Sequence, residues 1–451
     1  MPFNNEFANP LGYEAIFESE ILEGLKGFSF TPPEGEADFV HAIELMEVKL
    51  VEDLPISIPL EAVDKAIAVD GSIARVDDEL TYEMALLKIS TVVGDLKKIQ
   101  GLSGGTEIVS LDADDPLYER HHKSILLGGK GVYGSKEIGS FWQDKFRHDF
   151  SYAVNNFQLL NTSVRLSNFL SGFFQGGRKI TCQYCDTFAD DHTKKIRVGE
   201  KTSRCVDCGR TYYPTDALFS SWVSIRDNVG STYMSIMTIL EKILTLGMME
   251  SSPDLSREIY VTDGPLVMYG PFSHLTKLFR ERIQKLDVPL VIGVEKTGVH
   301  HSFALREDVQ SILRPGSVAL LHTELTERLC GRPYGLIQEQ YGYGKRFLYR
   351  TLDGEKTFVF MVVPEYGLPY VSKDDEDADS WDRYPHLRLY CEYLETHSID
   401  TFGTTEAALD ILAEANHEAS LPKLISERIL KEKMTQMRIN ETRRRNGDAS
   451  E

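Results

Sequence analysis

Short apolar runs that end at Asp-Gly pairs recur in this chain and predict strands of a buried β-sheet. Residues 66–69 read AIAV and precede Asp70, residues 259–262 read IYVT and precede Asp263, and glycine follows both aspartates. Runs of small and β-branched apolar residues are typical of central strands that are covered on both faces. We therefore expect two carboxylates at strand ends, with ordinary Asp-Gly turns as the alternative for each.

Strands and helices alternate in the second half of the chain. The pattern predicts a strand over 258–263, a helix over 273–286 and a strand over 288–295, joined by short links. This order implies a right-handed parallel crossover. Two further strands, over 345–350 and 357–363, are expected to pair antiparallel. The fold class that follows is α/β, with a mixed central sheet flanked by helices.

Helical periodicity dominates the remaining segments. Helices are expected over 14–25, 231–249, 404–416 and 421–445. Most of 80–174 also reads as helical, interrupted by a glycine-rich segment over 127–134 that we expect to be a flexible loop. This segment lacks the GK[ST] ending of a phosphate-binding loop. The acidic run over 373–379 reads as a solvated loop.

Four of the six cysteines form two Cys-x2-Cys pairs that 19 residues separate. This spacing predicts an inserted zinc ribbon whose thiolates bind one Zn²⁺. The expected ligands are Cys182, Cys185, Cys205 and Cys208. Because four sulfur ligands fill the coordination shell, such a site is structural and not catalytic. Disulfide bonding or redox sensing is the alternative, and Cys330 and Cys391 are expected to be packed core thiols.

Charge and hydropathy narrow the classes of function. The 451-residue chain carries a formal net charge of −20, which repels a polyanion and counts against a free-standing DNA-binding protein. The charge does not count against a metal nuclease, because clustered carboxylates bind the cations that meet the phosphate. No apolar stretch of 18 residues occurs and the N-terminus lacks a signal-peptide pattern, so we expect a cytoplasmic protein without membrane contact.

One carboxylate lies in an otherwise apolar helix. Residues 231–249 are apolar nearly all round the helix, which predicts burial and makes Glu241 an exception. The helix precedes the strand that ends at Asp263, so its packing on the sheet can bring Glu241 to that strand end. The alternative is a surface glutamate that pairs with Lys242 or Lys285. Carboxylate oxygens gathered at one place would suit a divalent cation.

A histidine near the C-terminus is a further candidate ligand. His417 stands where a C-terminal helix is expected to end or bend. A single histidine is more often structural or exposed than a ligand. Four other histidines compete for this role: His121, His122, His300 and His301.

The order of these motifs resembles that of the NurA nuclease family. AVDGS contains Asp70, a helix contains Glu241, VTDGPL contains Asp263, GVEK ends at Lys296, and ANHEA contains His417. The family has an RNase H-like core in which strand-end aspartates, a helix glutamate and a C-terminal histidine surround manganese. The resemblance covers about residues 63–430 and implies the same core here, although it does not explain the cysteine module.

The resemblance implies roles for individual residues. The implied Mn²⁺ or Mg²⁺ ligands are Asp70, Glu241, Asp263 and His417. His417 would complete the site or protonate the leaving oxygen, and Lys296 would offset charge on the phosphate. Glu250 and Glu258 remain alternatives to Glu241, and Asn416 separates the histidine from the alanine that precedes it in the family. The active-site tyrosine of the family has two candidates here, Tyr334 and Tyr341.

The resemblance also implies an activity. The expected protein is a homodimeric, metal-dependent nuclease that resects DNA ends with a hexameric HerA-type ATPase, in repair or in anti-phage defence. Two other hypotheses are a non-catalytic adaptor, which binds a partner or nucleic acid through the zinc ribbon and the basic C-terminal helix, and an RNase H-like ribonuclease. The three carboxylates distinguish an enzyme from an adaptor, because binding a partner does not require carboxylates that lie close together.

These expectations divide the chain into five parts. They are an N-terminal segment over 1–62 that docks a partner, the first part of the nuclease domain with a helical insertion over 63–177, the zinc ribbon over 178–213, the rest of the nuclease domain over 214–430, and a basic C-terminal helix over 431–451.

Overall fold

The computed structural model describes residues 46–78, 82–100, 117–129, 131–132, 142–158, 165–173, 178–182, 195–198, 202–218, 229–268, 270–329, 342–365, 379–400, 407–421, 428–433 and 435–436, together with Ile43 and Ser426. The chain divides after Met46, and the unit that begins at Glu47 carries every element named below. The expected helix over 14–25 lies outside the described residues, as do residues 1–42 of the expected docking segment over 1–62; residues 47–62 of that segment belong to the second unit.

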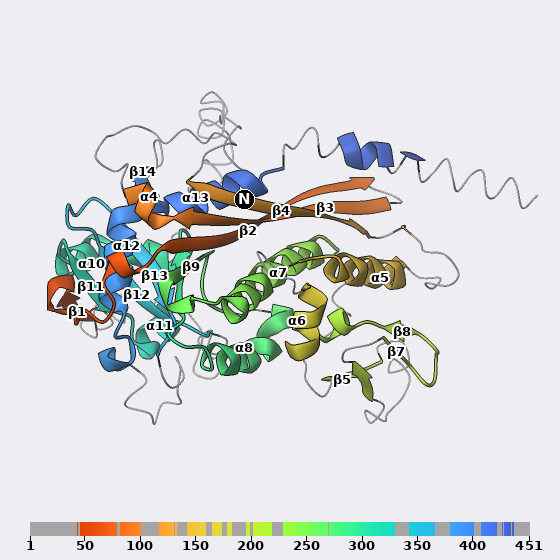
Figure 1. Cartoon of the computed structure of the whole chain (residues 1–451), viewed down its shortest axis with the longest axis horizontal. Coiled ribbons are helices and arrows are strands. Elements are labelled where there is room, and N and C mark those ends of the chain that lie inside the picture. The colour runs from red at the N-terminus through yellow and green to blue at the C-terminus, as the bar shows by residue number, and fades with distance from the viewer. Residues whose placement is uncertain are drawn as a thin grey trace, which may run out of the picture. The chain divides into compact units, whose positions relative to one another are not determined.

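A nine-stranded mixed sheet organises this unit, in the order β1-β11-β12-β13-β10-β9-β2-β3-β4 (Figure 1). Strands β10, β9 and β2 are mutually parallel, and the other neighbours are antiparallel. The strands are β1 (Glu47–Leu50), β2 (Lys65–Asp78), β3 (Tyr82–Asp95), β4 (Tyr118–Gly128), β9 (Glu258–Asp263), β10 (Leu290–Glu295), β11 (Ser317–Leu320), β12 (Lys345–Arg350) and β13 (Thr357–Val362). The prediction of an α/β protein with a mixed sheet is confirmed.

Helices cover both faces of the sheet. Those in the described residues are α4 (Leu96–Gln100), α5 (Trp142–Asn155), α6 (Leu166–Phe173), α7 (Val229–Ser251), α8 (Thr276–Ile283), α9 (Val299–Ala304), α10 (Glu307–Ile312), α11 (Thr323–Leu329), α12 (Leu387–His397) and α13 (Asp410–Ala419). Helices α5, α6, α7 and α8 pack in one core with Val69 and Ile89, and α12 and α13 pack in another with Ala68 and Val92. Successive residues along a strand thus point into opposite cores, as the two-residue period of a strand requires.

Shorter elements complete the fold. The 3₁₀ helices are η1 (Val51–Asp53), η2 (Leu60–Ala62), η4 (Pro214–Leu218), η6 (Leu255–Arg257), η7 (Gly270–Leu275) and η9 (Trp381–Arg383). Three small hairpins pair β5 (Arg178–Thr181) with β6 (Lys195–Val198), β7 (Ser203–Arg204) with β8 (Thr211–Tyr212), and β14 (Ser398–Asp400) with β15 (Ala407–Leu409). No helix in the described residues combines the length and apolar content that a membrane span requires.

The second half of the chain matches its predicted elements closely. Strands β9 and β10 are parallel and α8 lies between them in sequence, while β12 and β13 pair antiparallel. Helix α7 spans the predicted apolar helix. In the C-terminal part, Ser426 and residues 428–433 and 435–436 are helical, and Leu430 is buried against β2 and β3. Residues 404–416 are predicted as one helix, but the described part contains β15 before α13.

The helical prediction over 80–174 is wrong for β3 and β4. Strand β3 is buried on both faces, because Leu87 and Ile89 enter one core and Val92 the other. Burial on both faces removes the alternating pattern by which a strand is recognised, so a long apolar run reads as a helix. Strand β4 also continues through Gly128, so the first residues of the expected glycine-rich loop belong to the sheet.

Asp70 is not at a strand end. Strand β2 continues to Asp78, and its pairing with β3 passes without a break through Asp70 with Ser90 and Gly71 with Ile89. Gly71 is not among the described glycines with positive φ, so it forms no turn. The prediction is wrong because an extended glycine and a turn glycine look the same in sequence. Asp263, in contrast, ends β9, and Gly264 has a φ of +88°.

Candidate metal centre

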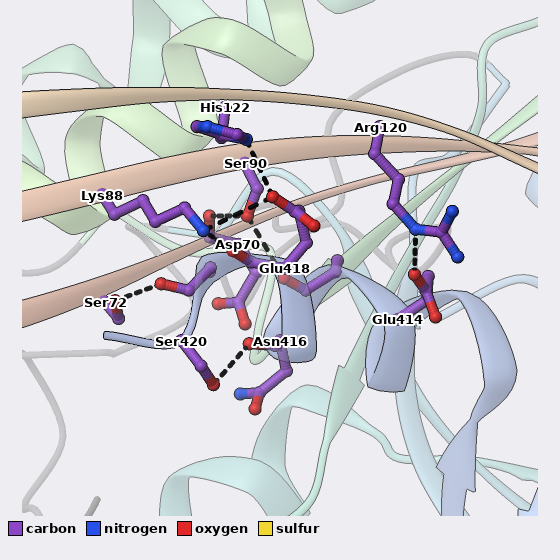
Figure 2. A network of polar contacts seen from close by, with 12 residues as sticks. Asp70, Ser72, Lys88, Ser90, Arg120, His122, Glu414, Asn416, Glu418 and Ser420 are labelled. Atoms are coloured by element: carbon purple, nitrogen blue, oxygen red, sulfur yellow. Dashed lines mark hydrogen bonds and ion pairs between the residues drawn. The ribbon is translucent and has the colours of Figure 1, made fainter. Parts of the chain in front are cut away.

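Asp70 lies in the middle of the sheet with its carboxylate facing α13 (Figure 2). The residue is 8% exposed. Its Oδ1 accepts a hydrogen bond of 2.8 Å from the Gly71 N–H, whereas its Oδ2 is buried and accepts no hydrogen bond within the described residues. A buried carboxylate oxygen without a donor costs free energy unless a cation or proton meets it. Asp70 therefore presents one oxygen that is suited to a ligand.

Glu241 approaches Asp70 from the opposite face of the sheet, on α7. The approach depends on Gly71: a Cβ at that position would stand 2.7 Å from Glu241 Oε1 and 2.6 Å from Met237 Cγ. The missing side chain thus lets the glutamate lie directly over the backbone next to Asp70. The sequence alternative, in which Glu241 pairs with Lys242, is not what the structure records, because Lys242 Nζ donates to the Pro265 carbonyl at 3.1 Å.

Asp263 adds a third carboxylate from the neighbouring strand. Strands β2 and β9 are paired in parallel through Val69 and Thr262, so the residues that follow on each strand, Asp70 and Asp263, are neighbours at the end of β9. Asp263 Oδ2 lies 3.1 Å from Lys296 Nζ, and its side chain is 37% exposed. The group of carboxylates therefore opens to solvent on the side of Asp263 and Lys296.

Burial and neighbouring carboxylates raise the pKa values of Asp70 and Glu241. Burial, and then the charge of Asp263, raise the pKa of Asp70 to about 6, while the Gly71 N–H, Lys296 and the Asn416 side chain oppose this shift. Burial, and then the charge of Asp70, raise the pKa of Glu241 well above its usual range. Both shifts mean that the ionised groups are stabilised too little by their surroundings. A divalent cation would supply the missing stabilisation.

The donor set fits a hard cation. Asp70, Glu241 and Asp263 offer only carboxylate oxygens, which Mg²⁺ and Mn²⁺ prefer, and Asp70 Oδ2 has no competing donor. The three are more widely spaced than ligands around an ion, since their oxygens are not all within 4.8 Å of one another. Three like charges repel, and Asp70 and Glu241 approach from opposite faces of the sheet, so side chains would have to move for all three to meet one cation.

The C-terminal end of α13 is fixed against the sheet by a polar network (Figure 2). Ser90 Oγ donates to the Ala415 carbonyl at 3.2 Å, and Ser72 Oγ donates to the Ala419 carbonyl. Glu418 accepts from Lys88 at 3.4 Å and lies 2.8 Å from His122 Nδ1. Because side chains of β2 and β3 bind the last carbonyls of the helix, and His122 of β4 lies against the Glu418 carboxylate, α13 is held beside Asp70.

Asn416, and not His417, faces Asp70. The Asn416 side chain lowers the pKa of Asp70 in part, which places the two side chains close together. His417 is exposed and, within the described residues, its side chain forms no hydrogen bond or ion pair with the three carboxylates. Its role stays a prediction. The helical period could have indicated Asn416, since Leu412, Ala415 and Ala419 are buried and residue 416 borders that face.

The other residues that the sequence offered as candidates have partners elsewhere in the fold, lie on other elements or fall outside the described residues. Glu250 binds Arg282 with two bonds of 2.5 Å, and Glu258 accepts from Tyr260 at 2.7 Å at the start of β9, far along the strand from Asp263. His121 pairs with Glu119 at 2.8 Å. His300 is buried beside Glu295, which also binds Arg346. His301 lies on α9, and Tyr334 and Tyr341 lie outside the described residues.

Three cysteines form a second site. Within the described residues, the Sγ atoms of Cys182, Cys205 and Cys208 are the one group of candidate ligands that all lie within 4.8 Å of one another. Cys182 Sγ and Cys208 Sγ are 3.7 Å apart, and the Tyr212 hydroxyl donates to Cys182 Sγ at 3.1 Å. None of the three forms a disulfide within the described residues, so the cluster could hold a metal ion such as zinc. Cys185 lies outside the described residues.

The cysteine site is joined to the main core through Arg147 of α5. This buried arginine pairs with Asp216, donates to the Thr211 carbonyl at 2.8 Å, and stacks over the Tyr212 ring at 4.4 Å. Tyr212 in turn contacts Cys182. A metal at the cysteines would therefore stabilise the packing of hairpin β7–β8 on α5. The prediction that Cys391 is a packed core thiol is confirmed, because it is buried and free.

Comparisons with known proteins leave the family open. No protein-family model matches this chain, and no curated protein matches it. The case for a function therefore rests on the two sites themselves: three hard carboxylates beside a lysine at the end of a parallel strand, and three soft thiolates in a separate hairpin module. Hard and soft donors select different metals, so the two sites would hold different ions.

Proposed function

We propose that this protein is a metal-dependent nuclease that hydrolyses phosphodiester bonds in DNA. The observation that carries the proposal is the convergence of Asp70, Glu241 and Asp263 around Gly71. Two of these carboxylates are charged only at a cost, as their raised pKa values indicate. Strongly perturbed carboxylates that are grouped at the end of a strand are typical of a functional site and not of a structural one.

The topology supports an RNase H-like core. Strands β4, β3 and β2 form an antiparallel meander, and β9 and β10 then continue the sheet parallel to β2. This arrangement agrees with the core that the likeness to the NurA family implies. The remaining strands β13, β12, β11 and β1 extend the sheet on the other side, and the cysteine module is an insertion between α6 and α7.

The residues of the site have separate parts in the proposed reaction. Asp70, Glu241 and Asp263 would hold Mn²⁺ or Mg²⁺, and such an ion supplies Lewis-acid activation of the phosphate and of the attacking water. Lys296, 3.1 Å from Asp263 and partly exposed, would meet the phosphate at the open side of the site and offset its charge. His417 is exposed on the last turn of α13, from which it could donate a proton to a leaving group.

The proposed substrate and partners come from the resemblance to the NurA family, and the net charge bears on how DNA would be delivered. A chain of net charge −20 repels DNA, so delivery by a partner is expected. We propose a hexameric HerA-type ATPase as this partner, the segment before residue 63 as its docking element, and a homodimer as the active form. The proposed setting is the resection of DNA ends, in repair or in anti-phage defence.

The test is a cleavage assay with the purified full-length chain and linear duplex DNA. We expect cleavage with Mn²⁺, none with EDTA, and strong stimulation by a HerA-type ATPase with ATP. A parallel assay with RNA distinguishes a ribonuclease. Absence of cleavage with Mn²⁺ and Mg²⁺, both with and without the ATPase, would instead support the adaptor hypothesis.

We further propose that the cysteine site holds one structural Zn²⁺, with Cys185 as its fourth ligand. Metal analysis of the purified protein should give about one zinc per chain, since a site of this type has one tetrahedral ion. Cys205→Ser should lose the zinc and expose the β7–β8 hairpin to proteolysis. Cys391→Ser, which changes a buried thiol elsewhere, should keep it. Equal zinc contents in the Cys205→Ser and unmodified proteins would refute the assignment.

A further inference from the structure

Lys242 lies next to Glu241 on α7 but points to a different element. Its Nζ donates to the Pro265 carbonyl at 3.1 Å and lies 5.7 Å from the centre of the buried Tyr343 ring. The side chain is partly buried, so this carbonyl and this ring replace much of its water. The Pro265 carbonyl also accepts from the Val267 N–H at 2.8 Å. Lys242 thus links the helix of Glu241 to the turn that follows Asp263.

That turn is seated closely on the sheet. The Gly264 N–H donates to the Val294 carbonyl at 2.8 Å, and the Leu266 carbonyl accepts from the Tyr343 N–H at 2.8 Å. Gly293 leaves the space that the turn occupies, because a Cβ there would stand 2.6 Å from the Gly264 carbonyl oxygen. Hydrogen bonds to β10 and to the segment before β12 therefore hold the backbone that follows Asp263.

We infer that Lys242 is a positioning residue that clamps the 263–266 turn to α7. Its bond to Pro265 is a side-chain hydrogen bond that ties this turn to the helix of Glu241, in addition to the apolar packing of Leu266 in the core that α7 shares. Through this link the lysine sets the position of Asp263 relative to Glu241, and both relative to Asp70. The inference rests on the proposed metal site, but not on the proposed substrate.

A purely electrostatic role is the competing explanation. Lys242 is close enough to Glu241 to lower its pKa in part, so its charge alone could favour the ionised glutamate. The two roles differ in what happens to the turn. A clamp holds the backbone after Asp263 in place, whereas a counter-charge leaves that backbone unaffected when it is removed.

The experiment compares Lys242→Met, which keeps the length of the side chain but removes its donor, with Lys285→Met, which changes an exposed lysine. Binding of Mn²⁺ alone is measured by the loss of the free-ion EPR signal. Loss of an outer partner of a metal ligand typically weakens affinity 10–100-fold, so we expect about a tenfold or greater weakening for Lys242→Met. Lys285→Met should bind as the unmodified chain does.

A second measurement separates position from charge. Hydrogen–deuterium exchange of the metal-free protein should show faster exchange at Gly264 in Lys242→Met and no change in Lys285→Met. Lys242→Arg, which keeps a long side chain with donors, should restore part of both effects and also serves if the methionine variant does not fold. Unchanged exchange at Gly264 would refute the clamp. If the unmodified chain binds no Mn²⁺, the metal site fails, while the exchange result still decides the role of Lys242.

Discussion

Asp70→Asn is expected to abolish metal-dependent DNA cleavage and, at the same time, to stabilise the metal-free protein. Cleavage should fall by about a thousandfold, because several kcal/mol of transition-state stabilisation are lost with the metal ligand. Initial rates with Mn²⁺ and a linear duplex measure this loss. Opposite effects on activity and on stability are the sign of a group that is kept for function at a cost to the fold.

The stability effect has a defined pH dependence. The pKa of Asp70 is about 6 in the folded protein against an ordinary value of 3.8, so folding favours the protonated form. Well below pH 3.8 the group is protonated in both states and costs nothing. Between pH 3.8 and 6 the unfolded protein ionises before the folded protein does, so the folded protein loses stability, by up to about 3 kcal/mol above pH 6. Chemical denaturation of Asp70→Asn without metal should show this gain at pH 8 and almost none near pH 3.

Asp263→Asn is the matched control. It should also lose cleavage, because it removes another proposed ligand, but it should bring no such gain in stability. Its side chain is 37% exposed and already paired with Lys296. Cleavage by Asp70→Asn at close to the normal rate would contradict the assignment of the site, whatever the stability result.

Gly71→Ala is expected to disable the site although no catalytic group is removed. The new Cβ would stand 2.7 Å from Glu241 Oε1, 2.6 Å from Met237 Cγ and 2.9 Å from Ile89 Cδ1. Glu241 Oε1 and Ile89 Cδ1 end their side chains, whereas Met237 Cγ lies near the backbone of α7, so the adjustment should cost about 1–3 kcal/mol in unfolding free energy. The adjustment moves Glu241 away from Asp70, and Mn²⁺ affinity and cleavage should each fall by about a hundredfold.

Gly94→Ala on the neighbouring strand β3 controls for the general cost of a methyl group in this sheet. Its Cβ would meet only outer carbon atoms of Ile99, Tyr118 and Ile411, at 3.1–3.3 Å, and no carboxylate. It should lose some stability and keep its cleavage rate. If Gly71→Ala and Gly94→Ala had equal activity, the close approach of Glu241 over Gly71 would have no functional importance.

The places of Glu241 and Asp263 in the fold were easier to predict from the sequence than the sheet around them. Glu241 could be recognised because a carboxylate in an apolar helix must meet a partner, and Asp263 because a turn glycine ends its strand. Strand β3 could not, since burial on both faces removes the alternation of polar and apolar residues. The reason for a glycine at position 71 was also hidden, because the side chains that leave no room for a Cβ there include Glu241, 170 positions away in sequence.

The sequence did not indicate Asn416, for a different reason. The histidine beside it attracts attention as a residue of known chemistry, whereas the side of α13 that meets the sheet is decided by the packing of Leu412, Ala415 and Ala419. Residues 416 and 417 are both exposed, but that packing brings only the side chain of residue 416 beside Asp70. For the cysteines, in contrast, the spacing alone was enough to predict that Cys182, Cys205 and Cys208 come together.

The most direct test of the central claim is the location of manganese in crystals of the full-length protein grown with Mn²⁺. Anomalous scattering identifies the ion without any assay of activity. We expect an anomalous peak from an ion that is coordinated by oxygens of Asp70, Glu241 and Asp263. This peak should be distinct from any zinc peak at the cysteines. Manganese bound elsewhere, or no peak at these three carboxylates at millimolar Mn²⁺, would contradict the claim.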